Sequence, residues 1–325
     1  MYEEPEEDLI VRWAVAEIFR HLRMKRSPAT LKFVKTTRIH KILYNTFEEL
    51  NIPVTRSWFR YGCFIHSKEL QSGNLGQLRS GYIRTKNLGS RLGRLTGRLG
   101  IDLRKTEQVL WKNTDAMPAR IIDYLDELYG NAPQDFRNIY NAKFKLNNTL
   151  HSFSKVDRYN SNKYLNWLSQ VRNDISDFHS SVFSLSYFSD MSDFAYEISE
   201  VLEEALIKGL LLAQNHKLTQ KKMVLLCRFD EFCDEYVWSP FAYGISAITV
   251  KGSRSEEVRR HQNYMKKIQV EESNKFLSSL NTLLSNEKIR LSWQESINWY
   301  KSKGVDKDFE TKLLTMQKIY EQSEV

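Results

Sequence analysis

The sequence predicts a mainly α-helical protein with a basic α-helical N-terminal module, a larger helical bundle and at most one short strand pair. Apolar residues recur three and four positions apart over most of the chain, which is the spacing of one helix face. The longest such series lies in residues 161–188 and predicts the core helix of a bundle or one strand of a coiled coil. Its members are Tyr164, Leu168, Val171, Ile175, Phe178, Val182 and Leu185.

The positive charge of the chain is concentrated in its first third. The whole chain carries a net +8, whereas residues 17–113 contain 20 Lys and Arg against 6 Asp and Glu, a difference of +14. A basic module of this kind attracts polyanions such as nucleic acid. Residues 115–133 contain proline and glycine and look like a joint, so we place a domain boundary between 1–115 and 116–325.

Cysteine use and terminal charge indicate the compartment. The three cysteines, Cys63, Cys227 and Cys233, form no CxxC pair, which suits a reducing environment better than a disulfide framework or a zinc ribbon. The chain begins with an acidic segment, and its longest apolar run is too short to span a bilayer. We therefore expect a cytoplasmic protein with no membrane partner.

Two helices are predicted at the start of the chain. Residues 6–24 begin with acids and end with basic residues, which matches the helix dipole. Ser27 and Pro28 supply the cap and the first residue of a second helix, which ends at Asn51. Residues 52–67 follow as a loop that can include a short strand.

Two arginines of this loop, Arg56 and Arg60, alternate with the rings of Trp58, Phe59 and Tyr61. Single-stranded nucleic-acid sites use this composition, because bases stack on rings while guanidinium groups meet phosphates. The alternative is that the rings close a small N-terminal core.

Residues 38–66 resemble the Panacea antitoxin family, in which a lysine-and-leucine helix ending in tyrosine precedes a proline turn and a tryptophan–glycine motif. The matching residues are His40, Lys41, Ile42, Leu43, Tyr44, Pro53, Trp58 and Gly62. The family usually has proline after that glycine, whereas this chain has Cys63. The resemblance implies a helical module that docks onto a partner protein, often a toxin, and carries out no chemistry itself.

Residues 71–100 are the strongest candidate for a binding segment. They contain no Asp or Glu and seven of the chain's 13 glycines. Such a segment repels itself and has a high affinity for polyanions. We predict nucleic-acid contacts from its six cations, Arg79, Arg84, Lys86, Arg91, Arg94 and Arg98.

The second half of this segment has three helical faces: apolar, cationic and bare. The apolar and bare faces consist of Leu88, Leu92, Leu95 and Leu99, and of Gly89, Gly93 and Gly97. Because each interior glycine weakens a helix by about 0.5–1 kcal/mol, we expect the segment to be mobile when free and to become ordered on a partner. The alternative is a surface loop with solvated charges.

The second half of the chain is predicted to be almost wholly helical. Helices are expected over 190–214 and 220–236, and a last helix contains Phe309, Leu313, Met316 and Tyr320. Residues 241–250, FAYGISAITV, are the one convincing strand candidate, and they end in a turn at Lys251 and Gly252.

Residues 172–179, RNDISDFH, resemble the active-site motif of the HEPN ribonucleases, an arginine commonly followed by a polar residue, with a histidine four to six residues further on. The matching residues are Arg172, Asn173 and His179. The resemblance implies a helical bundle, usually dimeric, that cleaves RNA without a metal. Its histidine moves protons and its arginine stabilises the phosphorane while the 2′-hydroxyl attacks. The alternative places both side chains at the rim of a packed helix.

No cofactor or metal is predicted, and the P-loop, GxGxxG, GxSxG and HExxH signatures are absent. Four acids lie at a spacing that can hold a divalent ion, but a solvated helix face is the simpler interpretation; they are Asp230, Glu231, Asp234 and Glu235. A basic run extends the cationic surface or forms an exposed helix face; it contains Lys251, Arg254, Arg259, Arg260, Lys266 and Lys267.

We therefore predict a nucleic-acid-binding accessory or regulatory protein of a larger complex, related to antiviral defence or to toxin–antitoxin systems. The expected partners are nucleic acid, either DNA or RNA, and a protein. Two alternatives stay open. One is a metal-independent endoribonuclease that uses Arg172, Asn173 and His179, and the other is an antitoxin-type module that docks onto an acidic protein.

Overall fold

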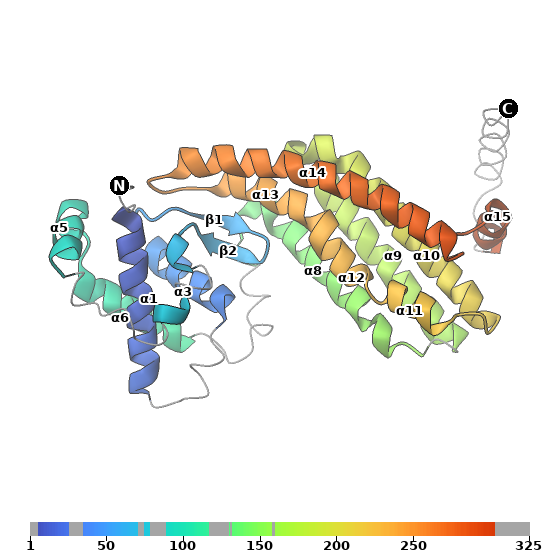
Figure 1. Cartoon of the computed structure of the whole chain (residues 1–325), viewed down its shortest axis with the longest axis horizontal. Helices are drawn as coiled ribbons and strands as arrows, with labels where there is room; N and C mark the ends of the chain where they lie inside the picture. The colour runs from blue at the N-terminus through green and yellow to red at the C-terminus, as the bar shows by residue number, and fades with distance from the viewer. Residues whose placement is uncertain are drawn as a thin grey trace. The chain divides into compact units, whose positions relative to one another are not determined.

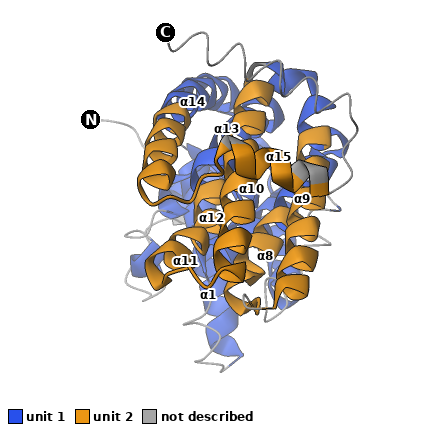
Figure 2. Ribbon diagram, turned by 90° about the vertical axis from the view of Figure 1, so that its right-hand side faces the viewer, with its two compact units in different colours: residues 1–144, 181–190, 235–272 blue, residues 145–180, 191–234, 273–325 orange. Residues whose placement is uncertain are grey.

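The structure is a computed structural model that describes residues 6–25, 35–70, 75–78, 89–116, 130, 132–157 and 160–302. It is mainly α-helical, and the described residues contain one two-stranded antiparallel sheet, as predicted (Figure 1). The chain forms two units, coloured in Figure 2. Unit 1 contains Met1–Phe144, Ser181–Asp190 and Glu235–Glu272, and unit 2 contains Lys145–Ser180, Met191–Asp234 and Ser273–Val325. Each unit therefore combines segments that are far apart in the sequence.

Helix α1 (Glu6–Met24) begins and ends where its charges predict. Its first turn contains three acids and its last turn contains His21 and Arg23, so both ends complement the helix dipole. Glu7 in the first turn is buried. Its Oε2 accepts hydrogen bonds from the Thr55 backbone N–H at 2.6 Å and from the Ser253 hydroxyl at 3.0 Å. This acid therefore joins three distant segments of unit 1.

Helix α3 (Thr36–Glu49) is followed by a β-hairpin. Strands β1 (Arg56–Phe59) and β2 (Gly62–Ile65) pair antiparallel, with Arg56 opposite Ile65 and Phe59 opposite Gly62. Gly62 has a φ of +99°, a conformation that favours glycine and closes the turn. The short strand expected in residues 52–67 is thus half of a hairpin. The predicted helix start at Ser27 and Pro28 lies outside the described residues.

The strand predicted for residues 241–250 is wrong, because this segment belongs to helix α13 (Trp238–Thr249). Most of its side chains are buried, including residues on every side of the helix, so its apolar residues show no helical period. A short apolar run without a period cannot be assigned to helix or strand from sequence. The helix packs against β1. Gly244 faces the Phe188 ring, where a Cβ would lie 2.7 Å from a ring carbon.

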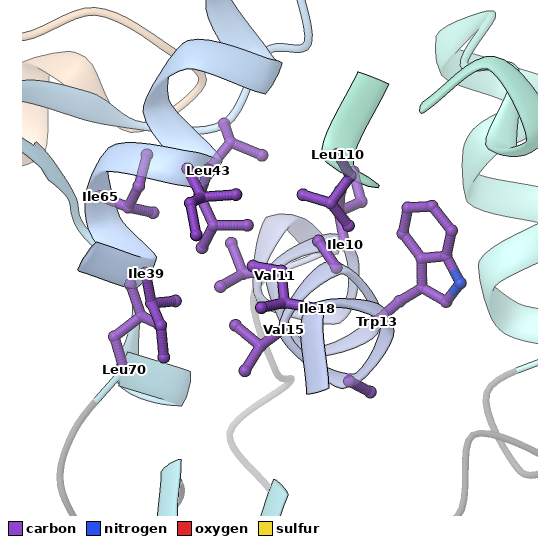
Figure 3. Packing of buried hydrophobic residues seen from close by; sticks show 14 of the residues in the cluster. Ile10, Val11, Trp13, Val15, Ile18, Ile39, Leu43, Ile65, Leu70 and Leu110 are labelled. Atoms are coloured by element: carbon purple, nitrogen blue, oxygen red, sulfur yellow. The ribbon is translucent and has the colours of Figure 1, made fainter. Parts of the chain in front are cut away.

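A hydrophobic core surrounds α1 in unit 1 (Figure 3). Figure 3 shows residues of α1 between α3 on one side and Leu110 of α6 (Leu103–Ala116) on the other. Leu92 and Leu95 of α5 (Gly89–Leu99) are 4% exposed and belong to the same core. The expectation that residues 89–99 order only on a partner is therefore wrong. Burial of the leucines stabilises a helix that its glycines weaken.

The helices predicted for the second half of the chain are present with two changes. Helix α9 (Ser161–Phe183) buries the apolar series from Tyr164 to Val182 but ends before Leu185, the last member of the series. Helix α10 (Ser192–Gln214) matches the predicted 190–214. The single helix predicted over 220–236 is divided into α11 (Gln220–Leu226), α12 (Phe229–Phe232) and the π-helical turn η6 (Cys233–Val237). The last predicted helix, with Phe309 to Tyr320, lies outside the described residues.

Within the described ranges, the remaining elements are three helices and four short 3₁₀ segments. They are α8 (Arg137–His151), α14 (Ser255–Asn286), α15 (Trp293–Ser302), η1 (Lys68–Leu70), η3 (Gln134–Phe136), η4 (Ser152–Lys155) and η5 (Ser186–Met191). None of the described helices is long and apolar enough to cross a membrane. The three cysteines are all free thiols.

Candidate functional site

Helix α5 separates a buried apolar face from an exposed cationic face. Leu92 and Leu95 pack into the core, whereas Arg91, Arg94 and Arg98 are exposed and Leu99 at the end of the helix is 39% exposed. The helix ends at Gly100, whose φ is +64°, and the Ile101 N–H donates to the Thr96 carbonyl at 2.8 Å. This is a glycine C-cap. The fold therefore holds three arginines on a packed scaffold. The other predicted cations of the segment, Arg79, Arg84 and Lys86, lie outside the described residues.

The three arginines of α5 have few competing partners. Arg98 pairs with Glu6, but the two side chains are 61% and 58% exposed, so the pair is weak in water. The Nε of Arg94 lies 3.4 Å from the Ser90 carbonyl oxygen, which is long for a hydrogen bond. Arg91 makes no hydrogen bond or ion pair with any described residue. All three guanidinium groups can therefore meet an external anion.

The glycine face of α5 is bare. A Cβ placed on Gly93 or Gly97 would have no heavy atom within 4 Å. On a helix with 3.6 residues per turn, these glycines lie beside the arginine face at Arg94. A phosphate backbone can therefore approach the helix main chain closely while the arginines contact its oxygens.

Two further exposed cations, which the sequence-based prediction missed, lie at the start of α6. Oδ1 of Asp102 accepts the backbone N–H groups of Arg104 at 2.8 Å and of Lys105 at 3.1 Å, and so caps the helix. The side chains of Arg104 and Lys105 are exposed. The sequence contained the signal for the helix start, because aspartate is a preferred N-cap residue and Asp102 stands directly before Leu103.

Arg56 was predicted to contact nucleic acid, and this prediction is wrong. Its side chain is 7% exposed, and its Nε lies 2.8 Å from Oε2 of Glu48. Its Nη1 donates to the carbonyls of Ile52 at 2.8 Å and Val54 at 2.9 Å. The guanidinium group therefore holds the turn before β1 and has little surface left for a ligand.

The aromatic residues of the hairpin were predicted either to stack on nucleic-acid bases or to close a small core, and the structure shows both arrangements. Trp58 is 3% exposed, and its indole N–H donates to the Tyr44 hydroxyl at 3.1 Å, so this ring closes the core. Tyr61 at the turn is 49% exposed, and the guanidinium carbon of Arg60 lies 5.5 Å from its ring centroid. The arginine–aromatic arrangement that suits bases is thus limited to the turn.

Most residues that match the Panacea pattern are buried within unit 1. Lys41 is fully buried, and His40 is 6% exposed. Nδ1 of His40 accepts the Ile65 N–H at 3.0 Å, and burial lowers its pKa to about 3. These side chains attach α3 to the hairpin. Any docking of a protein partner would therefore depend on other residues.

A groove lies between α9 and α10 within unit 2, with a volume of about 470 Å³. Arg172, Asn173 and His179 all line it, so the structure brings the three HEPN-like residues together. Helix α10 contributes Tyr196, Ser199, Glu200 and Glu203, and α9 adds Ser169, Ile175 and Ser176. The sequence-based prediction missed the α10 residues as site residues, because acidic residues along a helix usually form a solvated face.

His179 is half-buried in this groove and is held by α10. Its Nε2 lies 2.9 Å from the Ser199 hydroxyl and 3.1 Å from the Ala195 carbonyl oxygen. A carbonyl only accepts, so this contact assigns the hydrogen to Nε2. Burial lowers the pKa of His179, although the bond to Ala195 partly opposes that effect. The imidazole is therefore neutral at pH 7.

The carboxylates of Glu203 and Glu200 give the groove a net negative charge. The Nε of Arg172 lies 2.6 Å from Oε1 of Glu203, so the one lining arginine is already paired. Glu200 makes no hydrogen bond or ion pair with any described residue. Glu200 is exposed at the surface, but partial burial raises its pKa, the neighbouring carboxylates of Glu204 and Glu203 raise it further, and Arg290 lowers it. Among the charged residues of the lining, one arginine faces two glutamates, which leaves a formal charge of −1.

The acidic cluster at 230–235 forms no metal site in the described part of the chain, where no group of three or more His, Cys, Asp or Glu side chains could hold an ion. Asp230 lies 2.8 Å from Nδ1 of His151, and the Asn147 amide reaches Asp234 at 3.5 Å. These contacts are structural.

The basic run from Lys251 begins with structural residues. The Arg254 guanidinium pairs with Glu7 and donates to the His66 carbonyl at 2.6 Å. The backbones of Lys251 and Arg56 exchange two hydrogen bonds of 2.9 Å. Further along α14, Arg260 and Lys267 are exposed and form part of a helix face in solvent.

The chain matches one family over more than half its length. The matching family is described as a domain of unknown function (DUF8098), and the match covers residues 101–288. This range contains α6 and the α9–α10 groove, whereas α5 precedes it. No curated protein and no solved structure matches the chain. The chain belongs to the DUF8098 family.

Proposed function

We propose that the protein binds the phosphate backbone of nucleic acid, DNA or RNA, through the arginine face of α5. The observation that carries this proposal is the arrangement of Arg91, Arg94 and Arg98 in solvent on a helix that Leu92 and Leu95 anchor in the core. Arginine forms paired hydrogen bonds with phosphate oxygens and stays charged at every physiological pH.

The geometry of α5 favours contact with a backbone over recognition of base sequence. The arginines recur three and four residues apart, so they follow one side of the helix axis. The bare glycines beside them remove the side chains that would keep a polyanion away. Contacts of this kind position a protein on nucleic acid without specifying a sequence. A second component would then supply specificity, which is why we propose an accessory member of a larger complex.

The use of cysteine in this chain supports a cytoplasmic location. The three cysteines are free, and two of them, Cys63 and Cys233, are buried thiols. A protein of a reducing compartment uses cysteine in this way, as a small apolar residue. Nucleic acid is available as a partner in that compartment.

A direct binding experiment tests the proposal. Fluorescence anisotropy with labelled single-stranded DNA, single-stranded RNA and duplex DNA would compare the wild type with a variant carrying Arg91→Gln, Arg94→Gln and Arg98→Gln. We expect the triple variant to lose most of the affinity. A matched variant with Lys145→Gln, Lys163→Gln and Lys221→Gln changes the same charge at exposed sites of unit 2. Equal loss in the two variants would contradict the proposal.

Metal-independent RNA cleavage is a second candidate function, because Arg172, Asn173 and His179 line one groove. The electrostatics of that groove oppose it. The Arg172 guanidinium is paired with Glu203, and the unpaired carboxylate of Glu200 repels a phosphate. We therefore expect no cleavage of single-stranded RNA in the absence of metal. Cleavage that His179→Ala abolishes, with binding unchanged, would establish the enzyme instead.

A further inference from the structure

We propose that the α9–α10 groove binds an organic cation, an ammonium or guanidinium group carried on an apolar stem. This site is separate from the arginine face of α5, and the proposal does not depend on nucleic-acid binding. It rests on the shape of the groove, on the charges that line it and on one exposed ring. The ligand can be a free polyamine or the lysine or arginine side chain of a partner protein.

The charges of the groove select a cation. Arg172 and Glu203 neutralise each other at 2.6 Å, and His179 is neutral. Glu200 is exposed, lines the groove and has no partner among the described residues. It is therefore the carboxylate with which a ligand can form an ion pair. Concave sites that carry one sign of charge concentrate ligands of the opposite sign.

Tyr196 supplies an apolar surface beside this carboxylate. It lies one helical turn before Glu200 on α10, so the two side chains share a face. Tyr196 is 53% exposed and lines the groove, with its ring centroid 5.8 Å from that of His179. Organic cations are attracted to the faces of aromatic rings, and this attraction adds to an adjacent ion pair.

The rest of the lining suits the other hydrogen bonds of such a ligand. Ser169, Asn173 and Ser176 of α9 are exposed and line the same groove. Their hydroxyl and amide oxygens accept hydrogen bonds from an ammonium or guanidinium group. A volume of about 470 Å³ is within the range of small-molecule sites. The groove therefore offers a carboxylate, a ring and several acceptors at one place.

Isothermal titration calorimetry would test the site with three probes: spermidine, Nα-acetyl-arginine methylamide and sodium butyrate. We expect the two cations to bind and butyrate not to bind. The two cationic probes distinguish the possible ligands. Tighter binding of spermidine indicates a free polyamine, and tighter binding of the arginine derivative indicates a protein side chain. Failure of both cations to bind, or equal binding of butyrate, would overturn the proposal.

Three variants locate the site. Glu200→Gln is expected to weaken cation binding about tenfold, the loss typical of a charged hydrogen bond, and Tyr196→Leu is expected to weaken it severalfold. Glu197→Gln removes the same charge from an exposed residue of α10 outside the groove and serves as the control. If Glu197→Gln and Glu200→Gln have equal effects, the binding is a diffuse response to net charge and the site is refuted. Far-UV circular dichroism checks that each variant is folded.

Discussion

Arg172 and Glu203 form an ion pair across the α9–α10 groove, with 2.6 Å between Nε and Oε1. This pair neutralises the charge of the one arginine in the groove lining, whose side chain stays 40% exposed. A motif that resembles a ribonuclease site in sequence is thereby placed in a negative environment. The partner that decides the chemistry lies on another helix, 31 positions away in the sequence.

Releasing this arginine should change the preference of the groove. Glu203→Gln removes the ion pair and brings the formal charge of the lining from −1 to 0. We expect spermidine affinity to fall about fivefold, equivalent to ~1 kcal/mol, and weak binding of inorganic phosphate to appear. Titration calorimetry measures both, with Glu197→Gln as the control. Unchanged spermidine affinity would show that the groove does not respond to its own charge.

A separate prediction concerns Arg56, which the structure assigns to folding. Arg56→Met leaves the carbonyls of Ile52 and Val54 without their buried donor. We expect a loss of about 2–4 kcal/mol in the free energy of unfolding, measured by urea denaturation. The salt dependence of nucleic-acid binding should stay unchanged in the folded fraction. Arg260→Gln, at an exposed site of α14, is the control and should cost less than about 0.5 kcal/mol.

The glycines of α5 make a testable contribution to stability. Because a Cβ at Gly93 meets no other atom, Gly93→Ala should stabilise the protein by about 0.5–1 kcal/mol through helix propensity. Gly100→Ala should destabilise it by a similar amount, since Gly100 has a φ of +64°. Urea denaturation of the two variants gives the comparison. A destabilising Gly93→Ala would mean that something occupies the bare face.

Two histidines of unit 1, the buried His40 and the half-buried His66, should make stability fall in acid. Burial lowers the pKa of His40 to about 3 and of His66 to about 4 from an ordinary value of 6.5. Between pH 6.5 and 4 the unfolded chain therefore binds more protons than the folded chain. Each histidine should then reduce stability by about 1.4 kcal/mol per pH unit below 6.5.

The His66 contribution can be isolated by substitution. His66→Gln keeps a partner for the Ser57 hydroxyl, which lies 2.8 Å from Nε2, and should flatten the pH dependence. The unfolding free energies at pH 7.5 and pH 5.0 are compared between the variant and the wild type. The variant is needed because buried carboxylates such as Asp8 titrate in the opposite sense and also make stability depend on pH. Identical slopes in the wild type and in His66→Gln would contradict the burial argument.

Local sequence signals predicted the helices that have charged ends or a regular apolar spacing. The acids and bases of α1 and the apolar series of α9 gave both helices, because charge and periodicity act within a few turns. The strand prediction for residues 241–250 was wrong because this segment has no such signal. A segment buried on several sides has no polar face, so its helical period is hidden, and its β-branched and aromatic residues favour a strand.

Tertiary relationships could not be predicted in this way. The leucines of α5 pair with a core formed mainly by α1 and α3, and the sequence could not distinguish that core from an external partner. Arg56 looked exposed because the carbonyls and carboxylate that surround it belong to a turn and to α3. The groove residues Tyr196, Glu200 and Glu203 form a face only when α10 lies beside α9.

The salt dependence of nucleic-acid affinity tests the central claim most directly. Each phosphate contact contributes about −0.9 to the slope of log affinity against log salt for duplex DNA, or about −0.7 for a single strand. Anisotropy titrations of the wild type and of the variant with Arg91→Gln, Arg94→Gln and Arg98→Gln would be compared over a range of sodium chloride concentrations. We predict that the variant's slope is shallower by about 2–3, the sum of three lost contacts. A slope equal to that of the wild type would contradict the account, because the arginine face of α5 would then lie outside the binding site.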